Sequence, residues 1–119
     1  MVANLLVALV ALEHVYILVL EMFLWTRPVG RKAFRMSLEK AEITRVMAAN
    51  QGLYNGFLAA GLFWSVLHPD PAFAYQLKLF FLGAVIIAGL YGAKTVSRRI
   101  LFIQAAPAAL ALFSVLLTG

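Results

Sequence analysis

Three ionisable side chains, Glu13, His14 and Glu21, lie inside the first apolar stretch of the chain. That stretch covers residues 2–25, about 36 Å of helix at ~1.5 Å per residue, which is enough to cross a hydrocarbon core of about 30 Å. A charge at the centre of such a span costs at least ~2.5 kcal/mol. We therefore expect these side chains to face a bundle interior, a water pocket or one another.

The three side chains share part of one helix surface. On a helical projection His14 and Glu21 differ by about 20° in direction, and Glu13 is rotated about 100° from His14. An imidazole and carboxylates along one face could relay protons, coordinate a metal with ligands from other helices, or bind a polar ligand. They could equally hydrogen-bond neighbouring helices and serve assembly alone. Because the sequence has no His-x-x-x-His or Glu-x-x-His pair, we expect no metal site.

The second apolar stretch has a face that is both small and polar. Two of its members, Gly52 and Gly56, are spaced for close helix approach, which favours a packing seam. The other interpretation is a ligand site, in which amides donate and accept hydrogen bonds and Arg45 holds a carboxylate or phosphate. The face consists of Glu42, Arg45, Ala48, Ala49, Gln51, Gly52, Asn55, Gly56 and Ala59.

Composition places the chain in the membrane class. At 119 residues with 64% hydrophobic residues it is too apolar for a soluble domain of its size. Four apolar stretches, residues 2–25, 46–67, 77–93 and 100–117, each approach the ~20 residues that a span requires. The first has no basic segment before it and no small-residue cleavage site, so we expect a permanent helix and not a signal peptide. The sequence thus predicts an all-α polytopic membrane protein, one four-helix transmembrane bundle over residues 1–119.

Local signals set the expected helix ends. We expect the first helix to end near Trp25, because Arg27-Pro28-Val29-Gly30 should break the chain. Ser37 is a plausible N-cap for a second helix that extends from about Leu38 to Leu67 and begins before the bilayer. The run His68-Pro69-Asp70-Pro71 predicts a short turn between antiparallel helices. Near the C-terminus, Pro107 predicts a kink.

Basic residues are unevenly distributed between the spans. Residues 26–45 hold six of the ten Lys and Arg residues and residues 94–99 hold three more, whereas residues 68–75 hold none. The positive-inside rule then places loops 26–45 and 94–99 in the cytoplasm and both termini outside, in the cell's inner or plasma membrane. The net charge of +5 therefore indicates topology and contacts with membrane lipids, and no nucleic-acid partner.

Two runs carry a resemblance to a known family. Glu13-His14-Val15-Tyr16 with Leu20-Glu21-Met22, and Ala49-Asn50-Gln51-Gly52-Leu53-Tyr54-Asn55-Gly56, resemble small bacterial and fungal four-helix membrane proteins catalogued as a domain of unknown function. The resemblance covers nearly the whole chain. It implies that the His14 and Glu21 pair and the amides of the second helix belong to the family's pattern, and it implies no particular biochemistry.

A fainter similarity links the chain to the membrane-associated eicosanoid and glutathione enzymes, which are trimeric four-helix proteins with the same topology. Arg45 with residues 48–55 partly resembles the run that contributes to glutathione binding there. Tyr54 stands where that run has a glutamate, and the arginine within the run is missing. Under this alternative the chain would be a glutathione-transferase-like enzyme for lipophilic substrates, with glutathione held by Arg45, Gln51 and Asn55.

The expected function is to bind or pass a small polar solute or proton at an intramembrane His, Glu and amide site. Four helices alone enclose little space, so we expect a homo-oligomer, a dimer or trimer. No catalytic residue can be assigned from spacing, and no cofactor is implied outside the glutathione alternative. The candidate ligand-binding or proton-relay residues are Glu13, His14, Glu21, Glu42, Arg45, Gln51 and Asn55.

Overall fold

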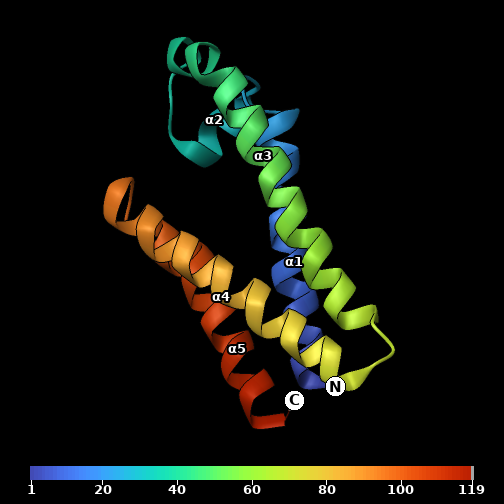
Figure 1. The fold of residues 1–119 in the computed structure, drawn as a ribbon. Helices are drawn as coiled ribbons and strands as arrows, with labels where there is room; N and C mark the ends of the chain where they lie inside the picture. The colour runs from blue at the N-terminus through green and yellow to red at the C-terminus, as the bar shows by residue number, and fades with distance from the viewer. Residues whose placement is uncertain (119) are drawn as a thin grey trace. The chain divides into compact units, whose positions relative to one another are not determined.

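The computed structural model describes residues 1–118, and every regular element among them is helical (Figure 1). The elements are α1 (Val2–Met22), α2 (Pro28–Phe34), α3 (Leu38–Leu67), α4 (Pro71–Thr95), the π-helix η1 (Leu101–Ala105) and α5 (Ala106–Thr118). They form two compact units. The central unit contains residues 12–59, and the terminal unit contains residues 1–11 together with the chain from residue 60 onward.

In the central unit, the connection between the first two long helices contains a short helix that the sequence did not predict. The first helix ends at Met22, slightly before Trp25, and α2 begins at Pro28, where the missing N–H and fixed φ of proline suit the first helical position. The expected break was therefore correct at Arg27 but wrong at Gly30, which lies buried inside α2. A side chain at Gly30 would overlap the Leu24 carbonyl oxygen, so the residue serves close packing.

The long third helix begins and ends where the sequence predicted, at Leu38 and Leu67. Ser37 is its N-cap, since its Oγ accepts a hydrogen bond from the Lys40 N–H at 3.1 Å. One turn later Thr44 Oγ1 accepts a hydrogen bond from the Trp25 indole at 3.0 Å, which ties the connection to α3. The first turns of α3 are thus anchored to the chain that precedes them.

In the terminal unit, the predicted turn after Leu67 is confirmed. Asp70 caps α4 by accepting a hydrogen bond from the Ala72 N–H at 3.0 Å, and Pro71 occupies the first turn. Farther along α4, Gly89 packs against the C-terminal segment. A Cβ at Gly89 would lie 2.8 Å from the Ala105 backbone nitrogen. Figure 1 shows α4 and α5 running side by side.

The sequence predicted a kink near Pro107, and the structure has a π-helical turn, η1, just before this proline. A proline has no N–H to donate to the carbonyl four residues earlier, here that of Ile103. The helix widens over Leu101–Ala105, and the Ala106 N–H donates to the Leu101 carbonyl, five residues back. Regular α-helix then continues to Thr118. The helical irregularity thus lies just before the proline, where π-bulges and kinks commonly occur.

Three helical segments of the described chain are long and apolar enough to cross a membrane: Val2–Met22, Pro71–Thr95 and Leu101–Thr118. The other expected span, residues 46–67, lies within α3, whose polar first half lowers its hydropathy. That fourth span remains a prediction. The all-helical class and the membrane character predicted from composition agree with this architecture.

Candidate functional site

The structure brings together one carboxyl group and one amide from the predicted set. Asn55 Nδ2 on α3 donates a hydrogen bond of 2.6 Å to Glu21 Oε1 on α1. Glu21 is only 6% exposed, and Asn55 is half-buried. Both residues belong to the central unit. A polar pair of this kind inside an apolar environment fixes the separation and rotation of its two helices.

Two glycines of α3 allow the helices to approach closely at this pair. A Cβ built at Gly52 would lie 2.6 Å from Met22 Cγ, 3.1 Å from Glu21 Cβ and 3.2 Å from the Leu18 carbonyl oxygen. One turn later, a Cβ at Gly56 would lie 2.7 Å from Leu18 Cδ1. The glycine spacing therefore marks a helix contact, as the sequence predicted. The contact places Glu21 beside the amide of Asn55.

Two further candidate residues of α1 are buried, His14 completely and Glu13 in part. His14 is completely buried, about two turns or ~10 Å of helix before Glu21 and on the same face. Glu13 Oε1 is buried and has no hydrogen-bond partner among residues 1–118. Because a buried polar group without a partner costs free energy, a carboxyl oxygen in this state needs a functional or structural reason.

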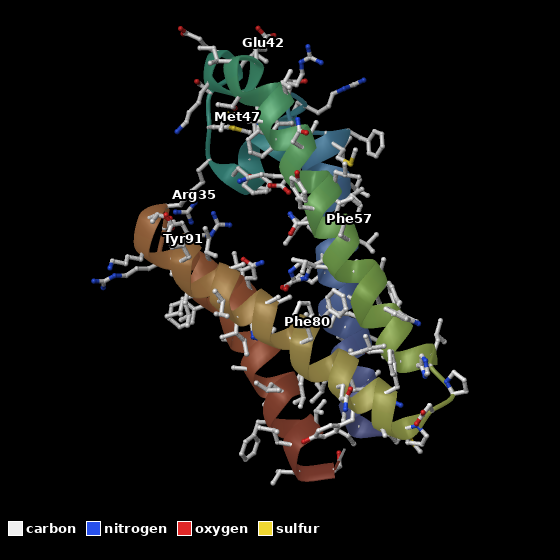
Figure 2. All side chains as sticks on the ribbon, in the orientation of Figure 1. Arg35, Glu42, Met47, Phe57, Phe80 and Tyr91 are labelled. Carbon is white, nitrogen blue, oxygen red and sulfur yellow. The ribbon has the colours of Figure 1, made fainter. Side chains whose placement is uncertain are left out.

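The remaining predicted residues lie outside this cluster. Glu42, Arg45 and Gln51 are exposed, and Figure 2 shows Glu42 near the N-terminal end of α3. Arg45 and Gln51, two of the three residues proposed to hold glutathione, are thus exposed, and that interpretation stays a prediction. Among residues 1–118, no three His, Asp or Glu side chains come together as a potential metal site.

Sequence reasoning missed a buried cation in the terminal unit. Lys78 on α4 is 5% exposed, and its Nζ donates a hydrogen bond of 2.6 Å to Asn4 Oδ1 on α1. The sequence feature that could have identified Lys78 is its charge, because it is the only Lys, Arg, Asp or Glu in the apolar stretch 77–93. The topology prediction rests on the basic residues between spans, and Lys78 is not one of them.

A cavity of about 260 Å³ adjoins Lys78 at one end of the terminal unit. It brings together the first residues of α1, the end of α3, the start of α4 and the end of α5. The lining residues are Met1, Ala3, Asn4, Ser65, Val66, His68, Pro69, Pro71, Ala74, Lys78 and Thr118. Met1 and Thr118, the two termini of the described chain, therefore lie at the same end of this unit as the turn between α3 and α4.

Comparison with known proteins identifies the family. Residues 8–116 match the family model described as "Protein of unknown function (DUF1304)". The chain is also 33% identical over 108 residues to "Uncharacterized protein YpaA" of Lactococcus lactis subsp. lactis (strain IL1403), covering 89% of each chain. No solved structure matches the chain. The resemblance found in the sequence is thus confirmed, and the chain belongs to the family described as "Protein of unknown function (DUF1304)".

Proposed function

We propose that Glu13, His14, Glu21 and Asn55 form an intramembrane site that binds or passes a proton or a small polar solute. The observation that carries this proposal is the buried Glu21 carboxyl group, whose Oε1 accepts a hydrogen bond of 2.6 Å from Asn55 Nδ2. This pair lies where two glycines of α3 allow α1 to approach closely. Polar and ionisable groups within a membrane are expensive, so they commonly mark a solute or proton pathway. Glu13, which borders this face, has a buried carboxyl oxygen with no hydrogen-bond partner among residues 1–118 and could accept one from a solute.

The chemistry of this site limits what it can accept. Two carboxyl groups supply acceptors, the His14 imidazole supplies a ring nitrogen donor and acceptor, and Asn55 holds Glu21 in a fixed orientation. The site thus suits a proton or a solute that donates hydrogen bonds, such as an ammonium ion or urea. The amide is not ionisable, so its role is to position the carboxyl.

The proposed setting is a four-span protein of the inner or plasma membrane with both termini outside. Three helices that are long and apolar enough to cross a membrane support this setting. Met1 and Thr118 also lie at the same end of the terminal unit, as an even number of spans requires. The fourth span, residues 46–67, would carry Asn55 to bilayer depth. A homo-oligomer, dimer or trimer, would enclose more of the polar face than four helices do.

Flux through proteoliposomes tests the function. Purified protein is reconstituted, and the entry of protons, ammonium and urea is measured against protein-free vesicles. We expect flux of at least one of these species, and at least a tenfold reduction in His14→Ala and Glu21→Gln. Glu39→Gln is the matched control, because Glu39 is an exposed carboxylate in the first turn of α3. Equal flux in all of these proteins would exclude the proposed site.

A further inference from the structure

The cavity of the terminal unit contains a buried positive charge that the proposed function does not use. We infer that this cavity binds a small oxyanion, a carboxylate or phosphate group, on the ammonium of Lys78. The site is separate in residues and opposite in charge from the Glu and His cluster of the central unit. Evidence for or against anion binding here therefore does not bear on the proposed proton or solute site.

The state of Lys78 is the first argument. Its side chain is only 5% exposed, and its one hydrogen-bond partner in the described chain is the neutral amide oxygen of Asn4. An ammonium group has three donors, so two remain for other partners. No ion pair with a carboxylate of residues 1–118 compensates the charge. Because a buried charge is strongly destabilising unless it is paired, an anion in the adjoining cavity would relieve that cost.

The lining of the cavity is the second argument, since it favours negative charge. His68 Nδ1 accepts a hydrogen bond of 3.1 Å from the Asp70 N–H, which leaves the proton of the neutral ring on Nε2 as a donor. Asn4 uses its oxygen toward Lys78 and keeps its NH₂ group as a donor. The starts of α1 and α4 and the ends of α3 and α5 all adjoin the cavity, so the helix dipoles favour neither sign of charge and the donors of Lys78, Asn4 and His68 carry the argument.

Two other polar side chains near the cavity are already engaged in local hydrogen bonds. The Asp70 carboxylate caps α4 by accepting a hydrogen bond from Ala72 N–H, and Asp70 is not among the lining residues. Ser65 is fully buried, and its hydroxyl donates to the Leu62 carbonyl at 2.6 Å, so its proton is not available to a ligand. Lys78, Asn4 and His68 are therefore the groups that would contact an anion.

Size and position identify the class of ligand. A volume of about 260 Å³ lies just below the ~300–1,000 Å³ typical of pockets for drug-sized molecules, so a single carboxylate or phosphate group fits better than a large metabolite. The cavity lies at the end of the unit where both termini meet. In the proposed topology that end faces the outer surface, where a dissolved anion and a phospholipid headgroup both present oxyanions.

Lysine-selective NMR of the whole protein tests the inference. The chain has four lysines, Lys32, Lys40, Lys78 and Lys94, so ¹⁵N-lysine labelling gives a small set of signals. The protein is held in maltoside micelles without phospholipid and titrated with sodium phosphate and with sodium acetate, against sodium chloride at equal ionic strength. We expect a saturable shift of the Lys78 signal with phosphate or acetate, and no such shift with chloride.

Further samples distinguish the source of the oxyanion and confirm the residue. If the Lys78 signal responds only to added short-chain phosphatidylglycerol, the ligand is a lipid headgroup; if it responds to phosphate or acetate, the ligand is a free anion. By calorimetry, Lys78→Met should weaken binding at least tenfold, whereas Lys94→Met, which removes an exposed lysine of the same helix, should not. A Lys78 signal that responds to none of these compounds overturns the inference. This result is read in the wild-type protein and does not depend on whether the variants fold.

Discussion

At the scale of single residues, two asparagines five positions apart on the same helix have different surroundings. Asn50 is exposed and donates to the Val46 carbonyl of its own helix at 2.9 Å, whereas Asn55 reaches across to the buried Glu21. The sequence placed His14 and Glu21 on one face and Asn55 on a small, polar face of α3. It could not show that these two faces meet, because pairing between helices depends on packing that no periodicity encodes.

This difference gives a residue-scale prediction. Asn55→Leu removes the partner of a buried carboxyl group, so we expect the free energy of unfolding to fall by about 0.5–2 kcal/mol, the usual range for a hydrogen bond between membrane helices. Asn50→Leu removes only a contact with the backbone of its own helix and should change stability by less than ~0.5 kcal/mol. Thermal unfolding of both variants in the same detergent measures the difference. Equal losses in both would contradict the special role of Asn55.

Lys78 is the functional candidate that sequence patterns did not reveal. A charge buried in an apolar span is as costly for the one lysine of the third stretch as for the acids of the first, so Lys78 needs a reason in the same way. Its partner Asn4 is 74 positions away in the sequence, so no spacing rule would have linked them. The charge could have been found from the sequence, but the cavity beside it could not.

At the scale of elements, capping residues and prolines in the sequence predicted where helices begin and where they are interrupted. Ser37 and Asp70 cap the helices that follow them, and a π-helical turn precedes Pro107, near which a kink was predicted. The short helix α2 was missed, because seven residues are too few for an apolar period to be recognised. Its C-cap is Arg35, a non-glycine residue with φ of 53°, where the sequence shows no usual C-cap signal.

The contact between α1 and α3 yields an element-scale prediction. Gly52→Ala places a Cβ 2.6 Å from Met22 Cγ and 3.1 Å from Glu21 Cβ, so the helices must separate or the side chains must shift. We expect a loss of about 1–3 kcal/mol in stability, the usual cost of overpacking. Gly83→Ala is the matched control in another helix, since a Cβ there meets nothing within 4 Å. Stability equal to wild type in Gly52→Ala would show that the two helices do not depend on this close approach.

At the scale of the whole molecule, composition and charge distribution allow more to be predicted than any motif. The apolar content indicated a helical membrane protein, and three helical segments have the required length and hydropathy. The side of the membrane on which each loop lies comes only from the basic residues in loops 26–45 and 94–99. Oligomer size has no comparable signal in the sequence, because stripes of small residues fit dimers and trimers alike.

Cysteine labelling tests the predicted topology, since the natural chain contains no cysteine. In intact cells, a membrane-impermeant maleimide should modify Pro69→Cys and Thr118→Cys, which lie at the end where both termini meet. Val29→Cys and Ser97→Cys should react only after the membrane is opened. All four positions are exposed, so access to the thiol is set by the membrane and not by burial. Labelling of Val29→Cys in intact cells would reverse the assigned orientation.

The measurement that tests the central claim most directly is flux and thermal stability of Glu13→Gln, made on the same preparation. Its buried carboxyl oxygen has no hydrogen-bond partner among residues 1–118, so a role in helix assembly gives no reason to keep the acid. If this face is a working site for a proton or polar solute, Glu13→Gln should unfold at the wild-type temperature or above it while flux falls at least tenfold. Unchanged flux would contradict the proposed site, and the polar face would then serve packing alone.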